Sequence, residues 1–437
     1  MIKPITFCIP TAKNEKEYVL LLLKSLKENT QIDKHEILIF IDSDNQHSYE
    51  AIVEFQKTVP NLKIYRNTLP TQIGGQRNIS LMFDAASNDI VCYLQSDMVA
   101  CRDFDKHISK NLHNESIVLT CTRIEPPLHP ASPEKIIQDF GTSPEIFKYD
   151  EFQEFATQLQ KSNKQNTEGH FAPFALYKNV WLETLGGFDT QFRCSREDSD
   201  MIIRMKLAGL KLVQTWDASV YHFTCVSSRG KDWFKAESDK KIQQKNILQQ
   251  YADYQELKRF TRKWGFFGHD AKPIFDIGIY LNIDQFVDFN VLQFLEVYCK
   301  TLYLNDESVA TELNRRILFE YQYYTNLRWD YSTDHWNKVK YLFNNSTIDN
   351  HIQYQSNFIH THDINISINY SDLIDNFNQN RQQFISQINQ WISSRSEGIY
   401  EVPPFTIDIK NKNDLTNSYI KVNNRDLLLD KKTFVFA

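Results

Sequence analysis

The chain has 437 residues. This is too long for a single small hydrophobic core, so we expect two domains, or three. Its 41% hydrophobic and 13% aromatic content is typical of a folded protein, and a net charge of −6 with scattered Lys and Arg argues against a nucleic acid partner. Seven cysteines, odd in number and without a CxxC pair, argue against a disulfide framework or structural zinc and fit a reducing compartment.

The first hundred residues alternate apolar strand-like runs with segments of helical spacing. We predict strands at Ile5–Ile9, Glu36–Ile41, Leu62–Tyr65 and Ile90–Leu94, and helices at Glu15–Asn29, Ser48–Thr58 and Arg77–Ala86. This alternation indicates an α/β fold with a mostly parallel, Rossmann-like sheet and crossover helices. In such sheets ligands bind beyond the carboxyl ends of the strands, so the polar residues that follow each strand are the first candidates for a site.

The following segment is less regular. Residues 123–170 are rich in Pro, Ser and Gln and read as a substrate-facing loop region or an ordered insertion. After it we predict a strand at Phe174–Tyr177, helical turns at Val180–Leu185, a helix at Glu197–Leu207, and strand-like runs at Leu212–Val213 and Ser219–Phe223. These elements complete an N-terminal domain of residues 1–235.

The composition changes after about residue 231. A polar helix is predicted at Asp239–Trp264 and a turn at Gly265–Gly268, so residues 236–268 read as a helical connector. The rest, residues 269–437, reads as a smaller, helix-rich α/β domain for acceptor binding or self-association. Its predicted elements are a helical stretch over 290–324, a strand at Asp363–Tyr370, a helix at Ser371–Ser393 and a strand at Thr406–Ile409.

Targeting signals are missing from the sequence pattern. The first residues run directly into a strand-like segment without a signal-peptide pattern, and the apolar runs are too short to span a bilayer. We therefore expect a soluble, cytoplasmic protein whose membrane contact is at most peripheral.

Acidic residues follow two of the predicted strands. Asp97 comes after the strand that ends at Leu94, where a carboxylate is well placed to hold a divalent cation against two phosphates. Asp42 and Asp44 follow the strand that ends at Ile41, where an Asp can accept from a base N–H or a ribose hydroxyl. Taken singly, Asp97 is more simply a turn residue, and a turn explains Asp42 and Asp44 equally well.

A glycine pair, Gly74 and Gly75, precedes the helix that carries Arg77. Glycines let the backbone approach a ligand closely, and a helix N-terminus beside an arginine favours phosphate. The segment is neither a P-loop nor a GxGxxG motif, and an ordinary flexible helix entry also accounts for it.

A second acidic group begins the helix at Glu197. Ser195 to Asp198 fits a capping box, which by itself explains a carboxylate at 198, and Asp200 and Arg204 are spaced to pair on the helix surface. The glycines Gly186 and Gly187 stand ten residues upstream, and two adjacent acids are more than capping needs. An acid here is a candidate general base that takes a proton from an acceptor hydroxyl.

His222 ends the last apolar run of this half. A lone histidine after a strand is more often a core residue, but a neutral imidazole can join Asp97 on a cation such as Mn²⁺. The segment Val226–Lys231, with Arg229, then reads as a cationic loop able to close over a pyrophosphate.

The order of these motifs resembles glycosyltransferase family 2 with the GT-A fold, over roughly residues 4–235. The motifs that carry the resemblance are Pro10, Asp42, Gly75-x-Arg77-Asn78, Asp97, Gly186-Gly187-Phe188-Asp189, Glu197-Asp198-x-Asp200, Arg204, Gly209 and His222. The resemblance implies an inverting displacement from a nucleoside-diphosphate sugar, a UDP-sugar first, to a hydroxyl of a glycan or other acceptor, with Mn²⁺ or Mg²⁺.

The resemblance also implies roles for individual residues. Asp198 is the expected base, Glu197 orients the acceptor, and Asp97 and His222 bind the metal. Expected donor contacts come from Pro10, Thr11, Glu15, Asp42, Asp44, Arg77, Asn78, Gln95, Ser96 and Arg229. The family's Asp-x-Asp is Gln95-Ser96-Asp97 here, so the first acid is replaced by an uncharged amide and a weaker metal site is expected.

Two rival interpretations stay open at the level of sequence. A sugar nucleotidyltransferase on a similar sheet usually has a glycine-rich basic loop after the first strand, whereas Pro10 to Glu15 contains no glycine. A non-catalytic carbohydrate-binding scaffold has no need of Asp97, Glu197, Asp198 and His222 together. Both observations favour the transferase.

Overall fold

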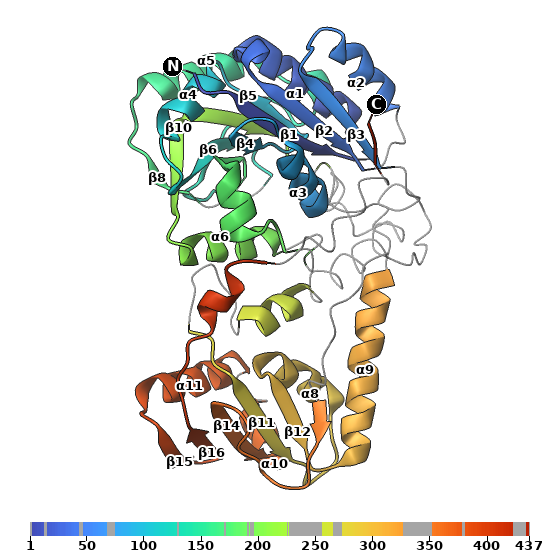
Figure 1. Cartoon of the computed structure of the whole chain (residues 1–437), viewed down its shortest axis with the longest axis vertical. Coiled ribbons are helices and arrows are strands. Elements are labelled where there is room, and N and C mark those ends of the chain that lie inside the picture. The colour runs from blue at the N-terminus through green and yellow to red at the C-terminus, as the bar shows by residue number, and fades with distance from the viewer. Residues whose placement is uncertain are drawn as a thin grey trace. The chain divides into compact units, whose positions relative to one another are not determined.

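The structure is a computed structural model of the whole chain (Figure 1). It describes residues 2–12, 15–42, 47–67, 75–128, 131–169, 172–189, 192, 196–224, 226, 256–264, 273–326, 352–377, 381–422 and 434–436. The chain forms two compact units. The first contains residues 1–253, 328–337 and 420–437, and the second contains residues 254–327 and 338–419.

The first unit is built on an 11-stranded mixed sheet within the described ranges. Its main path has the order β17-β3-β2-β1-β4-β9-β6-β10-β5, with β7 beside β6 and β8 beside β10. The strands are β1 (Ile5–Thr11), β2 (Glu36–Ile41), β3 (Leu62–Asn67), β4 (Ile90–Tyr93), β5 (Met98–Ala100), β6 (Ile117–Glu125), β7 (Lys135–Ile137), β8 (Thr167–Glu168), β9 (Phe174–Tyr177), β10 (Lys211–His222) and β17 (Phe434–Phe436).

Alternation along the central strands builds a core on each face of this sheet. Phe7 and Ile9 of β1 belong to one buried cluster, while Cys8 between them belongs to the other. Helices α1 and α2 lie on one face and α3 and α6 on the other (Figure 1). The helices are α1 (Lys16–Asn29), α2 (Ser48–Gln56), α3 (Gly75–Ala85), α4 (Phe104–Asn111), α5 (Tyr149–Lys161) and α6 (Glu197–Leu207), with short turns η1 (Ile32–Lys34), η2 (Pro144–Ile146) and the π-helical η3 (Val180–Leu185).

The strand order creates a topological switch point between β1 and β4. From β1 the chain adds β2 and β3 on one side, all parallel, and then crosses to place β4 parallel on the other side. Carboxyl ends of strands that diverge in this way leave a crevice, which is the usual ligand site of open α/β sheets. The residues after β1, β2 and β4 therefore share one edge of the sheet.

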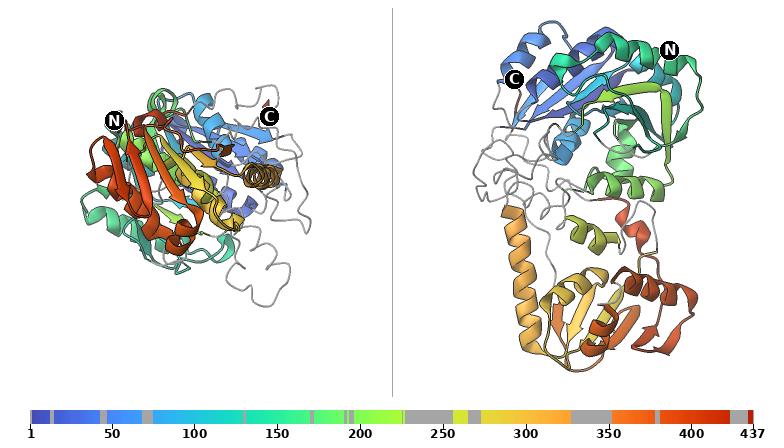
Figure 2. Two further views of the ribbon diagram at one scale, coloured as in Figure 1. Left: turned by 90° about the horizontal axis from the view of Figure 1, so that it is seen from below. Right: turned by 180° about the vertical axis from the view of Figure 1, so that it is seen from behind.

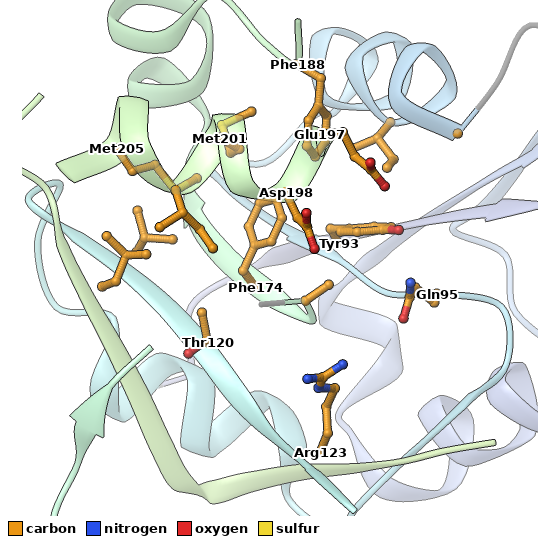
Figure 3. Close-up of a pocket in the computed structure, with 16 residues that line it drawn as sticks. Tyr93, Gln95, Thr120, Arg123, Phe174, Phe188, Glu197, Asp198, Met201 and Met205 are labelled. Atoms are coloured by element: carbon orange, nitrogen blue, oxygen red, sulfur yellow. The ribbon is translucent and has the colours of Figure 1, made fainter. Parts of the chain in front are cut away.

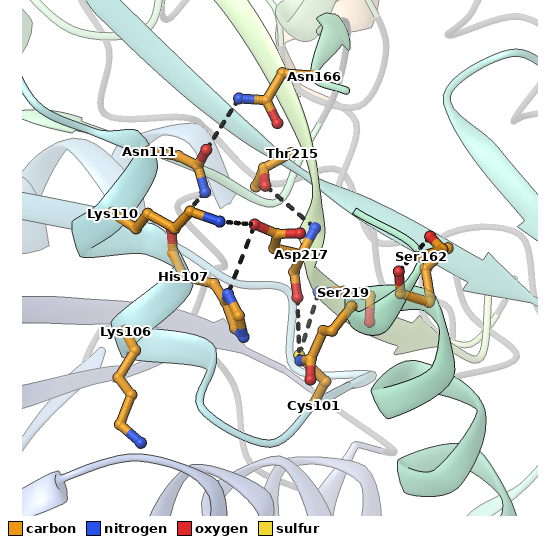
Figure 4. Close-up of polar contacts among 12 residues, drawn as sticks. Cys101, Lys106, His107, Lys110, Asn111, Ser162, Asn166, Thr215, Asp217 and Ser219 are labelled. Carbon is orange, nitrogen blue, oxygen red and sulfur yellow. Dashed lines mark hydrogen bonds and ion pairs between the residues drawn. The ribbon is translucent and has the colours of Figure 1, made fainter. Parts of the chain in front are cut away.

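A bulge in β10 redirects the last part of this strand. Thr215 pairs with Cys121, but Ser219 pairs with the next residue of β6, Thr122, so three residues of β10 have no partner in β6. Asp217 lies in the bulge, where its N–H bonds to Thr215 Oγ1 at 3.2 Å and its carboxylate meets Lys110 of α4 at 2.8 Å (Figure 4). After the bulge β10 runs antiparallel to β5, which brings His222 opposite Met98.

The second unit contains a six-stranded sheet in the order β13-β12-β11-β14-β16-β15. Figure 2 shows this sheet with helices α8 to α11, whose side chains share one core with it. The elements are β11 (Ile277–Asn282), α8 (Phe289–Leu295), η5 (Glu296–Tyr298), β12 (Thr301–Leu304), α9 (Glu307–Asn326), β13 (Ile352–Tyr354), β14 (Ile364–Asn369), α10 (Tyr370–Phe377), α11 (Arg381–Ser394), β15 (Gly398–Val402), β16 (Phe405–Ile409) and η6 (Thr416–Tyr419).

Several predicted elements differ from those in the structure. Residues 123–170 were predicted to be irregular, which is wrong for α5, whose Phe152 and Ala156 are buried one turn apart. The helical stretch over 290–324 contains strand β12 between α8 and α9. The two runs at 212–213 and 219–223 belong to one strand, β10, interrupted by its bulge.

Both limits of the predicted connector, residues 236 and 268, lie outside the described residues. Of the connector itself, residues 256–264 are described, and they are helical. The end of the chain returns to the first unit, since β17 pairs antiparallel with β3. In the described part of the chain, no helix is both long enough and apolar enough to cross a membrane.

Candidate functional site

The carboxyl ends of β1 and β2 present Thr11 and Asp42 side by side. The Asp42 N–H donates to the Thr11 carbonyl at 2.9 Å, and both residues are buried. Asn67, the last residue of β3, donates from Nδ2 to Asp42 Oδ1 at 2.8 Å and to its carbonyl at 3.1 Å. Backbone and side-chain contacts from β1 and β3 therefore fix Asp42 at the end of β2, at the same edge of the sheet as the switch point.

Glu15 ties the end of β1 to the segment after β4. Its Oε2 accepts hydrogen bonds from Ser96 Oγ at 2.6 Å, from the Ala12 N–H at 3.0 Å and from Thr11 Oγ1 at 3.2 Å. The side chain is only 4% exposed. Burial raises the pKa of this carboxyl from 4.5 to about 7, with a further increase from Asp97, against the lowering effect of the three donors.

Asp97 and His222 meet where β10 runs beside β5. Asp97 Oδ1 lies 3.6 Å from His222 Nε2, and the Phe223 N–H donates to the Asp97 carbonyl at 3.0 Å. Burial raises the pKa of Asp97, and the neighbouring histidine partly opposes this increase. Residues separated by 125 positions in the sequence are therefore joined by strand pairing.

The other ring nitrogen of this histidine contacts Glu125, the last residue of β6. Glu125 Oε1 is 2.8 Å from His222 Nδ1, and Glu125 Oε2 accepts from Lys135 Nζ at 2.9 Å. Burial raises the pKa of Glu125, but the hydrogen bond and charge of His222, with Arg123 and Lys135, lower it to about 2. Glu125 is therefore a carboxylate, and its pairs compensate the cost of burying it.

The donor set at this point fits a divalent cation. Two metal–ligand bonds of about 2.1 Å can bridge atoms up to roughly 4 Å apart, and the 3.6 Å between Asp97 Oδ1 and His222 Nε2 is within this reach. Within the described ranges, no three His, Cys, Asp or Glu side chains gather as a metal cluster. A cation held here would take its remaining ligands from phosphate and water, as hard cations in nucleotide sites commonly do.

A cavity of about 130 Å³ lies between α6 and the sheet (Figure 3). Glu197 and Asp198 reach from α6 toward Tyr93, and Arg123 points into the same space from the opposite side. Gln95 and Gly75, the first residue of α3, also line it. The remaining lining is mainly apolar and consists of Ile79, Val118, Thr120, Ala172, Phe174, Phe188, Met201, Ile202, Met205 and Leu212.

Asp198 stands in the first turn of α6 and is exposed, while Glu197 is half-buried. The N-cap residue is Arg196, in a left-handed conformation with φ 68°, and its side chain makes no capping hydrogen bond. Asp198 Oδ1 instead accepts from the N–H of the next residue, Ser199, at 2.7 Å. The capping box suggested by the sequence also requires Ser195, which lies outside the described residues, so it stays a prediction.

Asp200 and Arg204 do form the expected pair, but it is buried rather than on the helix surface. Arg204 Nε lies 2.8 Å from Asp200 Oδ2, and neither side chain is exposed to solvent. Arg204 also donates to the carbonyls of Leu185 and Gly187, both at 2.8 Å. Arg204 therefore links the segment that contains Gly186 and Gly187 to Asp200, and these contacts fix the start of α6.

Some predicted site residues cannot be compared with the structure. Asp44, Ser195 and Arg229 lie outside the described residues, and of Arg77 only its backbone position in the first turn of α3 is described. Asn78, one residue further along, is buried. The nucleotide contacts assigned to these residues stay predictions.

Three residues at this edge were not singled out from the sequence. Arg123 and Glu125 project from β6, two residues apart and hence on the same face, and Tyr93 is the last residue of β4. Burial raises the pKa of the Tyr93 phenol, as do the nearby carboxylates of Glu197, Asp97 and Asp198. Their position at the end of a strand is the sequence signal that could have identified them. Arg123 and Glu125, however, lie in the stretch that was interpreted as irregular.

Comparison with protein families matches residues 6–186 to the model described as Glycosyl transferase family 2. No curated protein matches the chain. The matched residues run from β1 to the end of η3, so they include the switch point, Asp97 and one wall of the cavity.

Three solved structures illustrate the likeness of fold. They are GalNAc-T7 with UDP, GalNAc and Mn²⁺ (15% identity, TM-score 0.39, 51% of this chain and 44% of that chain), S. aureus TarS 1–349 in complex with UDP (16%, 0.36, 59% and 71%), and the mannosyltransferase PcManGT from Pyrobaculum calidifontis in complex with GDP-Man and Mn²⁺ (17%, 0.38, 58% and 64%). The chain spans less than half the length of the first of these.

The sheet topology and the site define the class of protein. Parallel strands around a switch point, with carboxylates and amides gathered beyond their carboxyl ends, are the architecture of an open α/β domain whose ligand site lies at this edge. Residues 6–186 of this domain match the model of glycosyltransferase family 2. The predicted fold, a GT-A-type Rossmann-like domain followed by a smaller α/β domain, is confirmed.

Proposed function

We propose that the protein transfers a sugar from a nucleoside-diphosphate sugar to a hydroxyl of a glycan or other acceptor, with inversion, and that Asp198 is the general base. The observation that carries the proposal is the position of Asp198: an exposed carboxylate on the first turn of α6, lining a cavity with Gln95 and Tyr93. The family match of the same domain supports glycosyl transfer as the reaction class.

The donor would bind along the switch point. Asp42, held by Asn67, accepts from base or ribose groups, and Gln95 supplies amide hydrogen bonds where an acid is more usual. Asp97 and His222 would hold the cation, which neutralises the charge that develops on the leaving diphosphate. An imidazole ligand suits Mn²⁺ better than Mg²⁺, so we expect Mn²⁺ to support the stronger nucleotide binding.

The acceptor would approach from the side of α6. In this arrangement Asp198 takes the proton of the attacking hydroxyl as the new glycosidic bond forms and the bond to the diphosphate breaks. Glu197 and Arg123, on opposite sides of the cavity, would orient the two sugars. Arg204 keeps the start of α6 in place through the Leu185 and Gly187 carbonyls, so the base position is set by buried contacts.

A thermal-shift screen of UDP, GDP, CDP and dTDP, each with Mn²⁺, with Mg²⁺ or with a chelator, tests the donor site. We expect one nucleotide, UDP first, to raise the melting temperature only when Mn²⁺ is present. Asp97→Ala should remove the metal-dependent part of this shift. If Asp97→Ala leaves nucleotide affinity unchanged with Mn²⁺ present, Asp97 is not a metal ligand.

A further inference from the structure

Glu125 lies directly behind His222, on the side away from Asp97. Its side chain is buried, and its Oε1 is 2.8 Å from His222 Nδ1, whereas Nε2 of the same ring lies 3.6 Å from Asp97 Oδ1. Glu125, held by Lys135 through its other oxygen, faces Nδ1 as a hydrogen-bond acceptor, so in an imidazole that binds a metal through Nε2 the N–H is placed on Nδ1. Nε2 is then left with its lone pair directed toward Asp97.

Glu125 is itself fixed by an element that has no other evident role at the site. Strand β7 pairs in parallel with the end of β6, with Glu125 opposite Ile137, and the Gln138 N–H donates to the Glu125 carbonyl at 2.9 Å. This pairing places Lys135, only 8% exposed, 2.9 Å from Glu125 Oε2. The lysine compensates the buried charge at the second carboxylate oxygen, while the first faces the imidazole and also lies 3.4 Å from Arg123 Nη1.

We propose that Glu125, supported by Lys135, is a positioning residue that sets the ring orientation and tautomer of His222, so that Nε2 is available as the second protein ligand of the cation. The inference rests on the proposed function, because it concerns the metal of that site. A carboxylate behind a metal-bound imidazole fixes its tautomer and raises its basicity, and loss of such a partner typically lowers metal affinity about 10- to 100-fold.

The alternative is that Glu125 serves stability alone. Buried His–carboxylate pairs also occur in this fold without any cation: His35 Nε2 lies 2.8 Å from Asp105 Oδ2, and both side chains are buried. His35 Nδ1 accepts from the Ile5 N–H, so this pair closes the amino end of β1. Asp105→Asn is therefore a matched control that removes the same kind of buried charge at a place without a cation site.

The test measures Mn²⁺ binding to the full chain by electron paramagnetic resonance, with Mn²⁺ alone and again with UDP. The variants are Glu125→Leu, Glu125→Gln, His222→Ala and Asp105→Asn, each checked for folding by circular dichroism below its melting temperature. We expect Glu125→Leu to raise the Mn²⁺ dissociation constant about 10- to 100-fold. Glu125→Gln, whose amide oxygen still accepts from Nδ1–H, should recover part of this loss.

The outcomes separate this inference from the proposed function. If the wild-type chain binds no Mn²⁺, the metal assignment of the proposed function fails. If His222→Ala weakens Mn²⁺ binding while folded Glu125→Leu or Glu125→Gln does not, only the positioning role fails. Asp105→Asn should lower the melting temperature and leave Mn²⁺ affinity intact. An equal loss of Mn²⁺ affinity in this control would mean that the effect of Glu125 is general destabilisation, and would overturn the inference.

Discussion

Glu15 makes the stability of the first unit depend on pH in a direction opposite to that of most carboxylates. Its pKa is about 7 in the folded chain against 4.5 for the free group, mainly because the side chain is buried. The folded state therefore holds the proton more tightly than the unfolded state, and stability falls as the pH rises from about 4.5 through 7. A difference of about 2.5 pH units corresponds to about 3 kcal/mol when the change is complete.

Replacing Glu15 by Gln removes the titration but keeps an oxygen for the Ser96 and Ala12 donors. We expect Glu15→Gln to be more stable than the wild type at pH 8, and this advantage to shrink by about 2 to 3 kcal/mol between pH 8 and pH 5. Any constant cost of the amide cancels in that comparison. The assay is urea unfolding read from hydrogen exchange of peptides from β1 and β2, so that the first unit alone reports.

Glu36 provides a matched control on the neighbouring strand. It is also buried, but hydrogen bonds from Lys63, Ser87 and Thr6 outweigh burial and lower the pKa of its carboxyl. It stays ionised in the folded chain from pH 5 to 8, so Glu36→Gln should differ from the wild type by a nearly constant amount over this range. Parallel stability profiles for the wild type and Glu15→Gln would refute the reasoning on Glu15.

Two further predictions concern stability. Arg204→Met leaves Asp200 charged and two carbonyls without their donor, and should cost about 3 to 5 kcal/mol in urea unfolding of the first unit. Arg315→Met, which removes an exposed ion pair with Glu312, should leave the urea midpoint of unfolding unchanged. Gly278→Ala places a Cβ 2.2 Å from Cδ2 of His362, a ring held by Asp276 and Tyr303, and should speed hydrogen exchange in β11 and β14 while nucleotide binding is kept. Unchanged protection of these strands would contradict that packing.

Elements marked by local patterns could be predicted from the sequence. The bounds of β2, β9 and α6 are those expected from apolar runs and helical spacing, since a buried strand or an amphipathic turn is visible within a few residues. Helix α5 was missed because its buried positions, such as Phe152 and Ala156, stand in a polar stretch. Strand β12 was absorbed into a helical prediction because its four buried residues, Thr301–Leu304, fit either period.

The site itself depends on contacts between distant residues, which no local pattern contains. Asp97 and His222 were selected one by one from strand ends, but their contact arises from the pairing of β10 with β5 beyond a bulge. Glu125 was not selected, because its role is visible only when β6, β7 and β10 lie side by side.

The central claim is that Asp198 accepts the proton of the attacking hydroxyl, and Asp198→Asn tests it most directly. The amide keeps the size of the side chain and its acceptor for the Ser199 N–H, but it cannot take a proton. With the nucleotide identified in the screen and its sugar donor supplied, we predict unchanged Mn²⁺-dependent nucleotide affinity and a loss of sugar transfer of roughly 10²- to 10⁴-fold. Transfer at the wild-type rate in this variant would contradict the claim and move the base to Glu197 or Asp189.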